Sequence, residues 1–395
     1  MTTRNDLRIR DVRAIPLERK LDRVYQGGTY EITSRYTLVT EVVLENGITG
    51  YTFGGDETNY QKAITSLIND DFRPMLIGEE LPNLERMWTR MFECKALDHR
   101  NRSIHTLDLA NHSIKMQAIA AVDLALWDAF GKALNLSVCQ LLGGYRDRVP
   151  VIAIGGYYQK GKGDAEFREE LLHYKGLGMA GMKLKVGRLT PKEDVERVRF
   201  AREIVGPDFM IACDANQAWT VDQAIEFGRG AQIYNLRWLE EPVRWYDQLR
   251  GLSQLRAAIK IPVCAGQGEI CGYGCRDLIG NNAIDILNVD VTIAGGVTEW
   301  RRMAAMAGLL NVTMAHHEEP QAALHLLAAV PNGLYVEIFP DPQRDPLWFE
   351  LPVEQPRIED GYMYVPHKPG FGIDLRRDII ERYRADNVSA EVAVS

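Results

Sequence analysis

The sequence predicts an α/β protein, a (β/α)₈ barrel of the TIM type with an α+β capping domain at the N-terminus that the C-terminal tail completes. Two observations lead to this prediction. The first hundred or so of the 395 residues show strands followed by helices. After about residue 145, eight short apolar runs recur with helical stretches between them. Eight strand–helix units suit a closed barrel, which typically takes roughly 250 residues.

The N-terminal part combines a hairpin with a long helix. The stretch TLVTEVVLENGITGYTFGG is rich in β-branched residues and turns at Asn46-Gly47, which predicts a hairpin. The stretch MQAIAAVDLALWDAFGKALN favours a helix. We expect the capping domain over residues 1–125, the barrel over 126–350, and a segment over 351–395 that packs back on the capping domain.

The barrel strands are expected at eight apolar runs, most of which start about 25–30 residues apart. A doubly wound open sheet is the rival fold, but no G-x-G-x-x-G motif follows a strand, and eight units favour closure. The runs are VPVIAIGG, GMKLKVG, FMIACDA, RWLEEP, IPVCAGQ, DILNVD, NVTMAHH and LYVEIF.

Composition and charge narrow the class of protein. Hydrophobic residues make up 46% and charged residues 25% of the chain, as in soluble globular enzymes. The net charge of -8 comes without a basic block, so we expect no nucleic-acid partner. No apolar run approaches roughly 20 residues and the start MTTRNDLRIRDV lacks an apolar core, so we expect neither a membrane span nor a signal peptide. Six scattered cysteines favour reduced thiols and a cytoplasmic location. We also expect the chain to form a homo-oligomer.

Two lysines end the second run, at Lys183 and Lys185. Alternate residues of a strand point to the same face, so both side chains are expected in the barrel mouth, where such enzymes carry their chemistry. A neighbouring cation and partial burial both lower the pKa of a lysine, and such a lysine can act as a base near neutral pH. The alternative is an exposed edge with two solvated lysines.

Oxygen-bearing side chains end the next three runs. Asp214 and Asn216 share one face, Glu240 ends the fourth run, and Gln267 and Glu269 follow the fifth. Carboxylates that converge from adjacent strands are the ligands that Mg²⁺ prefers. Any one of them alone would also suit the start of a helix, so the prediction of one divalent cation depends on the three runs together.

The last three runs end in Asp290, His317 and Glu337. An Asp beside a His on the next strand fixes the tautomer of the imidazole and raises its basicity. The mouth would then hold lysines on one side, an Asp–His pair on the other, and a cation between them. This arrangement suits removal of a proton next to a carboxylate, because the charge of the enediolate meets fixed positive charge.

Taken together, these residues resemble the enolase superfamily, and within it the mandelate racemase subgroup. The resemblance covers nearly the whole chain. It includes the stretch AAVDLALWDAFGKALNLSVCQLLGG (residues 120–144), which is similar to the segment that leads into that family's barrel, and IAGGVTEW (residues 293–300).

The resemblance implies roles in proton transfer. Lys185 would be the base on one face of a small carboxylate substrate, and Lys183 would touch the substrate carboxylate. His317, paired with Asp290, would be the acid or base on the opposite face. Glu337 would assist the enediolate.

The resemblance also implies the metal ligands and the source of specificity. Asp214 and Glu240 would bind Mg²⁺. The smaller domain would cover the mouth, and its loop near DRVYQGGTYEITSRY would select the substrate. From that loop we expect Arg23 and Tyr25 to contact substrate, together with Asn216.

The chain departs from the family at the third metal ligand, where the family usually has Glu and this chain has Gln267. The uncharged amide of Gln is a weaker ligand for Mg²⁺. Either Gln267 ligates, or Glu269 takes over, or the metal site is lost; an engineered replacement of Glu is a further alternative. Retention of the other site residues favours Gln267 in or beside the metal site, with Glu269 in support.

The site predicts enolisation more directly than it predicts the outcome. In the resembled subgroup, Lys-x-Lys with an Asp–His pair most often accompanies dehydration of an acid sugar, so we expect a dehydratase. Proton transfer between Lys185 and His317 would instead give a racemase or epimerase of a 2-hydroxy acid. A catalytically silent binding or scaffold protein of the same fold is the alternative outside enzymes.

Overall fold

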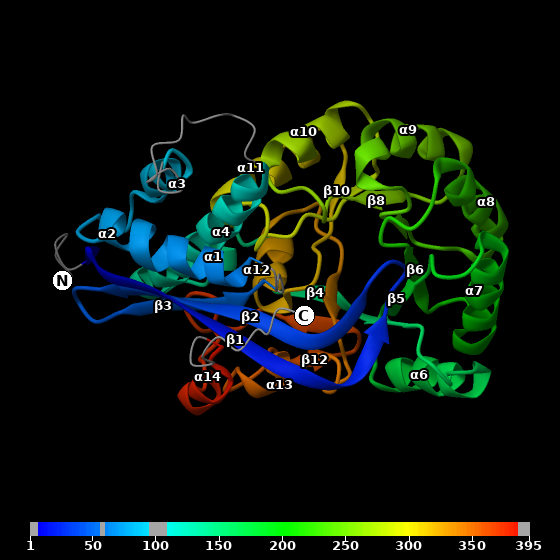
Figure 1. Cartoon of the computed structure of the whole chain (residues 1–395), viewed down its shortest axis with the longest axis horizontal. Helices are drawn as coiled ribbons and strands as arrows, with labels where there is room; N and C mark the ends of the chain where they lie inside the picture. Colours follow the sequence, from blue (N-terminus) through cyan, green and yellow to red (C-terminus); the bar gives the residue numbers. More distant parts are fainter. Residues whose placement is uncertain (1–6, 56–59, 95–108, 386–395) are drawn as a thin grey trace, which may run out of the picture.

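The computed structural model describes residues 7–55, 60–94 and 109–385. In these residues, an antiparallel sheet covered by helices stands against a barrel of short parallel strands (Figure 1). The predicted architecture, an α/β barrel with an α+β capping part, is confirmed. No helix in these ranges is both long enough and apolar enough to cross a membrane.

The capping part is built on three antiparallel strands in the order β1-β2-β3. Gly47, with a φ of 86°, makes the predicted turn between β2 and β3. The long helix α4 packs on β2 and β3, so its apolar residues close the core of this part. The elements are β1 (Ile9–Gln26), β2 (Glu31–Leu44), β3 (Thr49–Gly54), α1 (Gln61–Ser66), η2 (Leu67–Phe72), α2 (Arg73–Leu76), α3 (Leu84–Phe92) and α4 (Leu109–Leu134).

The barrel contains eight parallel strands in the spatial order β10-β9-β8-β7-β6-β5-β4-β11. Two backbone hydrogen bonds join β10 to the segment that leads into β11 and so close the ring. The N–H of Met314 donates to the carbonyl of Asn332, and the N–H of Leu334 donates to the carbonyl of Met314, each at 2.8 Å. The strands are β4 (Arg148–Gly155), β5 (Gly181–Lys185), β6 (Met210–Asp214), β7 (Leu239–Glu240), β8 (Val263–Ala265), β9 (Ile286–Leu287), β10 (Thr313–Met314) and β11 (Val336–Ile338).

Helices follow the strands and begin at local sequence signals. Thr190 accepts a hydrogen bond from the backbone of Glu193, with Pro191 in the first turn, and Thr220 does the same for Gln223. The helices are α5 (Val138–Leu141), α6 (Asp164–Gly176), α7 (Pro191–Val205), α8 (Val221–Ala231), α9 (Gln248–Ala258), α10 (Gly272–Gly280), α11 (Gly296–Leu309) and α12 (Pro320–Ala329).

The C-terminal segment joins the two parts. Buried side chains of α13 (Pro346–Glu350) and α14 (Arg377–Tyr383) form one apolar cluster with Leu17, Val39 and Phe53 of the capping sheet. Figure 1 shows these helices beside β1 and β2. Between them lie β12 (Ile358–Glu359) and β13 (Tyr362–Tyr364), which continue the barrel sheet from β4. The expected boundary at residue 125 falls inside α4, and residue 350 is the last residue of α13.

The hairpin β1–β2 carries the capping part over the barrel. In Figure 1 the two strands extend from the helices α1–α4 toward β5 and β6. At the tip, the hydroxyl of Thr29 donates to the carbonyl of Asn216, at 3.0 Å. Gly28 lies so close to the barrel loops that a Cβ there would be 2.8 Å from the carbonyl oxygen of Ala215. The tip therefore sits directly on the carboxyl ends of the barrel strands.

Candidate active site

Three predicted site residues end neighbouring barrel strands in register. Lys185 of β5 pairs with Asp214 of β6, which pairs with Glu240 of β7. Lys183 lies two residues earlier on β5, facing the same interior. All four side chains are buried, although each carries an ionisable group. The parallel strands thus bring cations and anions together at the carboxyl end of the barrel, where catalytic groups of such barrels lie.

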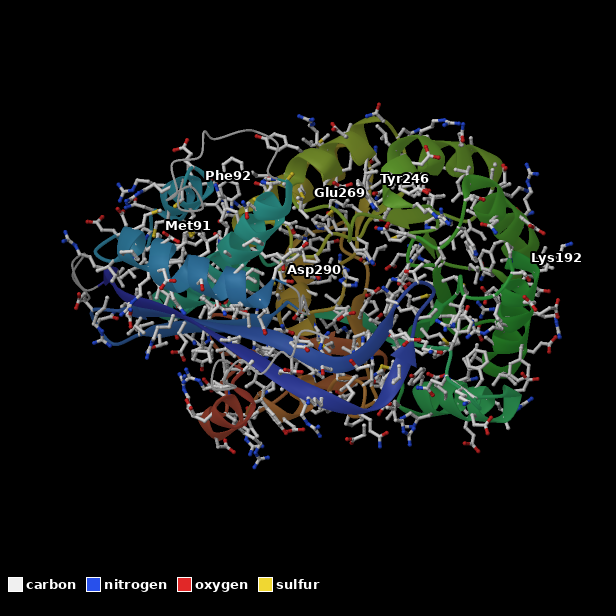
Figure 2. All side chains as sticks on the ribbon, viewed as in Figure 1. Met91, Phe92, Lys192, Tyr246, Glu269 and Asp290 are labelled. Atoms are coloured by element: carbon white, nitrogen blue, oxygen red, sulfur yellow. The ribbon has the colours of Figure 1, made fainter. Side chains whose placement is uncertain are left out.

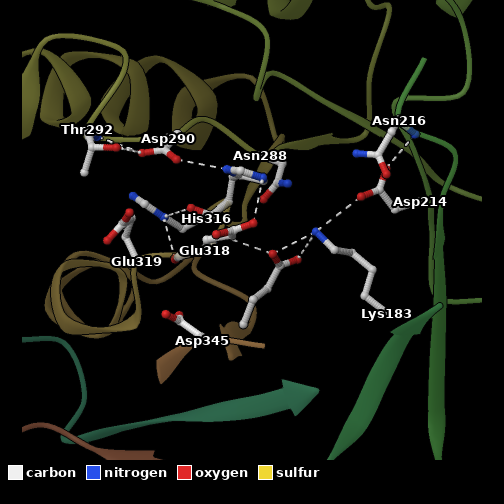
Figure 3. A network of polar contacts seen from close by, with 12 residues as sticks. Lys183, Asp214, Asn216, Asn288, Asp290, Thr292, His316, Glu318, Glu319 and Asp345 are labelled. Atoms are coloured by element: carbon white, nitrogen blue, oxygen red, sulfur yellow. Dashed lines mark hydrogen bonds and ion pairs between the residues drawn. The ribbon is translucent and has the colours of Figure 1, made fainter. Parts of the chain in front are cut away.

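The two lysines are held by carboxylates. Lys183 Nζ is 2.6 Å from Glu240 Oε1, 2.7 Å from Glu337 Oε1 and 3.8 Å from Asp214 Oδ2. Lys185 Nζ is 2.7 Å from Asp214 Oδ2. Figure 3 shows Lys183 reaching from its strand toward Asp214.

This environment reverses the expected pKa shift of the lysines. Burial lowers the pKa of Lys185, but the facing carboxylate of Asp214 outweighs burial and holds that pKa well above its usual value. For Lys183, burial likewise lowers the pKa, and the charges of Glu240, Glu337 and Asp214 raise it further than burial lowers it. The prediction of a lowered pKa counted the two ammonium groups and missed the carboxylates packed against them.

Negative charge is in excess at the base of the site. Three carboxylates, those of Asp214, Glu240 and Glu337, surround the two ammonium groups. Burial raises the pKa of Glu240, and the other two carboxylates raise it as well, against the opposing effect of Lys183. A further cation would relieve this excess.

Gln267 follows β8, the strand that pairs with β7, and its side-chain oxygen has no partner. Its Oε1 atom is buried and accepts no hydrogen bond, which is costly unless a ligand supplies a partner. The carboxylate of Glu241 accepts the backbone N–H groups of Gly266 and Gln267, at 2.8 and 3.1 Å, and so fixes the chain at this turn. The side chain of Gln267 lines the cavity of the site.

Glu269 lies two residues further on and points elsewhere. Its carboxylate covers Gly274 in the first turn of α10 and leaves no room for a Cβ there. A negative charge suits the start of a helix. Burial raises the pKa of Glu269. The carboxylate of Glu269 therefore packs against the start of α10.

The donor set suits a hard divalent cation, with an amide in place of a third carboxylate. In the described ranges, no three His, Cys, Asp or Glu side chains form a cluster that could hold a metal ion. Asp214 and Glu240 supply carboxylate oxygens, Glu337 brings the carboxylates to one more than the lysines, and Gln267 supplies the unpartnered amide oxygen. Oxygen donors of this kind are those that Mg²⁺ takes.

Asp290 and His317 form the expected pair on the loops after β9 and β10. His317 Nδ1 lies 2.9 Å from Asp290 Oδ2, and Asp290 Oδ1 accepts the hydroxyl and the N–H of Thr292 at 2.6 and 2.8 Å. Burial lowers the pKa of His317, but the bond to Asp290 and the charge of Glu318 raise it to about 10 overall. The contact with Asp290 thus favours the protonated imidazole, which is the form that can donate a proton. Figure 2 places Asp290 in the interior, whereas Lys192 projects from the outer face.

Residues after His317 tie the pair to the capping part. Glu318 Oε1 lies 3.6 Å from His317 Nε2, and Glu318 Oε2 lies 3.2 Å from the guanidinium of Arg35 on β2. Glu319 accepts the N–H of Gly55, at 2.8 Å. Glu318 and Glu319 have φ angles of 47° and 48°, which are unusual for residues with a Cβ. The strained loop is thus held by contacts with the cap.

A cavity of about 530 Å³ opens between the hairpin tip and the barrel mouth. Of the predicted residues, Asn216, Gln267 and His317 line it. Arg23 and Tyr25 line a neighbouring cavity of about 580 Å³. There the hydroxyl of Tyr25 donates to Asp341, at 2.8 Å. The structure therefore brings the lysines, carboxylates and His317 together, and places Arg23 and Tyr25 to one side.

Several residues of the site were not predicted. Asn288 donates to Glu240 Oε1 at 2.9 Å, and strand alternation could have found it, since it lies two residues before Asp290 in DILNVD. Arg35 and Glu318 carry no such signal, because their contacts depend on how the hairpin crosses the barrel. Tyr30 belongs to the same group, with its ring centroid 5.7 Å from Lys185 Nζ.

Comparisons with known proteins agree with the geometry. Residues 28–143 match the family "Mandelate racemase / muconate lactonizing enzyme, N-terminal domain", and residues 166–379 match "Enolase C-terminal domain-like". A solved structure described as mandelate racemase/muconate lactonizing enzyme is 40% identical, with a TM-score of 0.88, over 96% of this chain and 99% of its own. Another, from a marine actinobacterium and in complex with magnesium, is 39% identical, with a TM-score of 0.86 and the same coverage. Arabinonate dehydratase of Saccharolobus solfataricus is 28% identical over 88% of this chain and 90% of its own.

Proposed function

The chain belongs to the mandelate racemase/muconate lactonizing enzyme family of the enolase superfamily, and on that premise we propose that it is a Mg²⁺-dependent dehydratase of an acid sugar. The observation that carries the proposal is the His317–Asp290 pair, joined at 2.9 Å, which shares one site with Lys183 and Lys185. A base on one side and an acid on the other are what loss of water from adjacent carbons requires.

Asp214 and Glu240 would hold the metal, with the amide oxygen of Gln267 as a third donor. A divalent cation there supplies positive charge opposite the developing enediolate and takes up carboxylate charge that otherwise keeps a proton on Lys185. The magnesium of the actinobacterial relative supports this assignment.

The proposed chemistry removes one proton from carbon, delivers another to the leaving hydroxyl, and breaks one C–H and one C–O bond. Lys185 takes the proton from the carbon next to the substrate carboxylate, while Lys183 faces that carboxylate. The electron pair of the enediolate then expels the hydroxyl of the adjacent carbon, and His317 protonates this hydroxyl so that it leaves as water. The enol that remains tautomerises to a 2-keto acid. Asp290 keeps His317 charged until the proton is needed.

A racemase or epimerase would use the same two faces without loss of water. In such an enzyme His317 and Lys185 would each accept a proton in one direction of the reaction. The alternative of a silent scaffold has no support in an interior that keeps both lysines, both metal carboxylates and the Asp–His pair. One relative, arabinonate dehydratase, has a name that describes removal of water, which supports the dehydratase.

The test is turnover and isotope exchange on a panel of acid sugars with Mg²⁺. The wild type should release a 2-keto acid from at least one compound. The variant His317→Asn should lose this product but still exchange the α-proton in deuterated water, and Lys185→Ala should lose both. If product formed with inverted configuration and intact hydroxyl, the enzyme would be an epimerase. If no compound exchanged its α-proton in the wild type, the proposed function would be wrong.

A further inference from the structure

Arg344 is a buried cation on the loop after β11. Its side chain is 2% exposed, and its guanidinium carbon lies 4.0 Å from the ring centroid of Phe339. The rings of Tyr157 and Tyr25 flank it at 5.4 and 5.8 Å. Aromatic faces attract a guanidinium but accept little of its hydrogen-bonding capacity.

The guanidinium has donors without acceptors. One nitrogen, Nη2, donates to the hydroxyl of Tyr157 at a long 3.3 Å, while Nε and Nη1 are buried and have no partner. In the described part of the chain, no acidic side chain forms an ion pair with Arg344. A buried charge without a hydrogen-bonded counter-ion is strongly unfavourable.

Arg35 in the same cavity provides the contrast. It is also buried, but Asp345 lies 3.0 Å and Glu318 lies 3.2 Å from its nitrogen atoms. Among the acidic groups, Glu318 has the strongest electrostatic effect on Arg344. However, Glu318 already forms an ion pair with Arg35 and lies beside His317. The local charges thus satisfy one buried guanidinium and leave the other open.

The open guanidinium faces the space where substrate would bind. Arg344 lines the cavity that His317 and Gln267 line, and it also lines the neighbouring cavity. Lys185 Nζ lies 5.9 Å from the ring centroid of Tyr157, the same ring that stands 5.4 Å from Arg344. A single aromatic side chain therefore separates Arg344 from the proposed base.

We propose that Arg344 binds a second carboxylate, at the end of the substrate remote from the carbon that loses its proton. This inference rests on the proposed function and specifies its substrate class as a dicarboxylic acid sugar. The first carboxylate meets Lys183 and the proposed metal site, and the second supplies the counter-ion and acceptors that the guanidinium lacks. Arginine suits this role because its charge persists at all physiological pH values and its planar donors match a carboxylate.

The experiment compares matched pairs of six-carbon acids that differ only at C6, which is a carboxylate in one and a hydroxymethyl group in the other. Galactarate with galactonate and glucarate with gluconate are two such pairs. Calorimetric binding in the presence of Mg²⁺ is measured for the wild type, Arg344→Met and Arg344→Gln. The wild type should bind one diacid on the order of 10- to 100-fold more tightly than the matching monoacid, which is the affinity that a charged hydrogen-bonded pair contributes. Either substitution should reduce this preference to about threefold or less.

Thermal unfolding of the ligand-free variants supplies a second readout. Arg344→Met should unfold at the wild-type temperature or higher, because it removes an uncompensated buried charge. Arg35→Met should unfold at a lower temperature, because it leaves Asp345 and Glu318 without their partner. Marked destabilisation by Arg344→Met would show that the protein itself satisfies this guanidinium, and the inference would then fail.

The outcomes also separate this inference from the proposed function. Diacid binding that depends on Arg344, without formation of a keto acid, would support the inference and contradict the dehydratase. Dehydration of a monoacid, with no diacid preference in the wild type, would support the dehydratase and overturn the inference. A preference that survived in both Arg344 variants, or a wild type that bound none of the diacids, would overturn it too.

Discussion

Gln267 decides the charge of the proposed metal site. Its buried oxygen has no partner, and the two carboxylates beside it already face lysines. A carboxylate at this position would add one negative charge to the donor set. We therefore expect Gln267→Glu to tighten Mg²⁺ binding by on the order of tenfold or more, since ligand charge tunes the affinity of oxygen sites. Calorimetric titration of Mg²⁺ measures the change.

Glu269→Gln is the matched control for that titration. The carboxylate of Glu269 lies over Gly274 and not toward the metal site, so its removal should change Mg²⁺ affinity by less than about threefold. An unchanged affinity in Gln267→Glu would show that residue 267 does not face the metal. A large loss in Glu269→Gln would show that Glu269 turns into the site when the metal binds.

The bond between Asp290 and His317 should appear in the pH dependence of stability. The pKa of His317 is raised from 6.5 to about 10 in the folded protein. The stabilisation that this bond provides is therefore fully present below pH 6.5 and is lost as the pH rises through 10. We expect the variant Asp290→Asn to be less stable than the wild type at pH 6, and the difference in unfolding free energy to shrink toward pH 10.

Imidazole resonances check the same point directly. In Asp290→Asn the pKa of His317, followed by NMR, should fall toward its ordinary value. His325 serves as an internal control, because burial lowers its pKa to about 4 and its contacts lie with Phe371, away from Asp290. If the titration of His317 were the same in both proteins, Asp290 would not be the group that holds its proton.

The hairpin β1–β2 is the element that covers the site, and Gly28 is its closest approach to the barrel. A Cβ at Gly28 would lie 2.8 Å from the carbonyl oxygen of Ala215 and 2.9 Å from that of Val186. Both oxygens belong to the backbone, so relief of either contact requires a shift of the main chain. We expect Gly28→Ala to lift the hairpin tip, at a cost of about 1–3 kcal/mol in stability, and to lower kcat/KM on the preferred acid sugar by tenfold or more.

Gly176→Ala is the control for the hairpin variant. A Cβ at Gly176, near the end of α6, would meet no atom within 4 Å, so activity should stay within about twofold of the wild type. Retention of full kcat/KM in Gly28→Ala would mean that the seated hairpin is not needed for turnover.

At the scale of the whole molecule, the C-terminal segment completes the underside of the capping sheet. Ile380 of α14 is 1% exposed and belongs to the cluster with Leu17, Val39 and Phe53. Ile380→Ala should therefore lower the free energy of unfolding by about 2–5 kcal/mol. The same truncation at Ile233, which is 75% exposed, should change it by about 0.5 kcal/mol or less. Equal effects in urea denaturation would contradict the packing of the tail on the sheet.

The sequence predicted those features that depend on local order along the chain. Repeated apolar runs that end in polar residues indicated the barrel, and alternation along β5 placed Lys183 and Lys185 on one face. It did not predict the pKa of those lysines, which depends on carboxylates from other strands. It pointed to the loop that contains Arg35 but not to the ion pairs of Arg35, because its partner Asp345 lies 310 residues away, and it did not point to Arg344. Such contacts depend on how the capping part packs on the barrel, and no spacing of residues in the sequence predicts that packing.

The joining of the two chain ends has a consequence for synthesis on the ribosome. The last barrel strand, β11, pairs with the first, β4, and the apolar underside of the capping sheet is covered by residues beyond Pro346. At roughly 5–20 residues per second, tens of seconds pass between the emergence of Phe53 and that of Trp348. Throughout that interval Leu17, Val39 and Phe53 lack their cover, and the ring of strands stays open until β11 has emerged. We therefore expect the nascent chain to be inactive and to expose apolar surface of the kind that chaperones bind until the residues of α13 and α14 have left the ribosome.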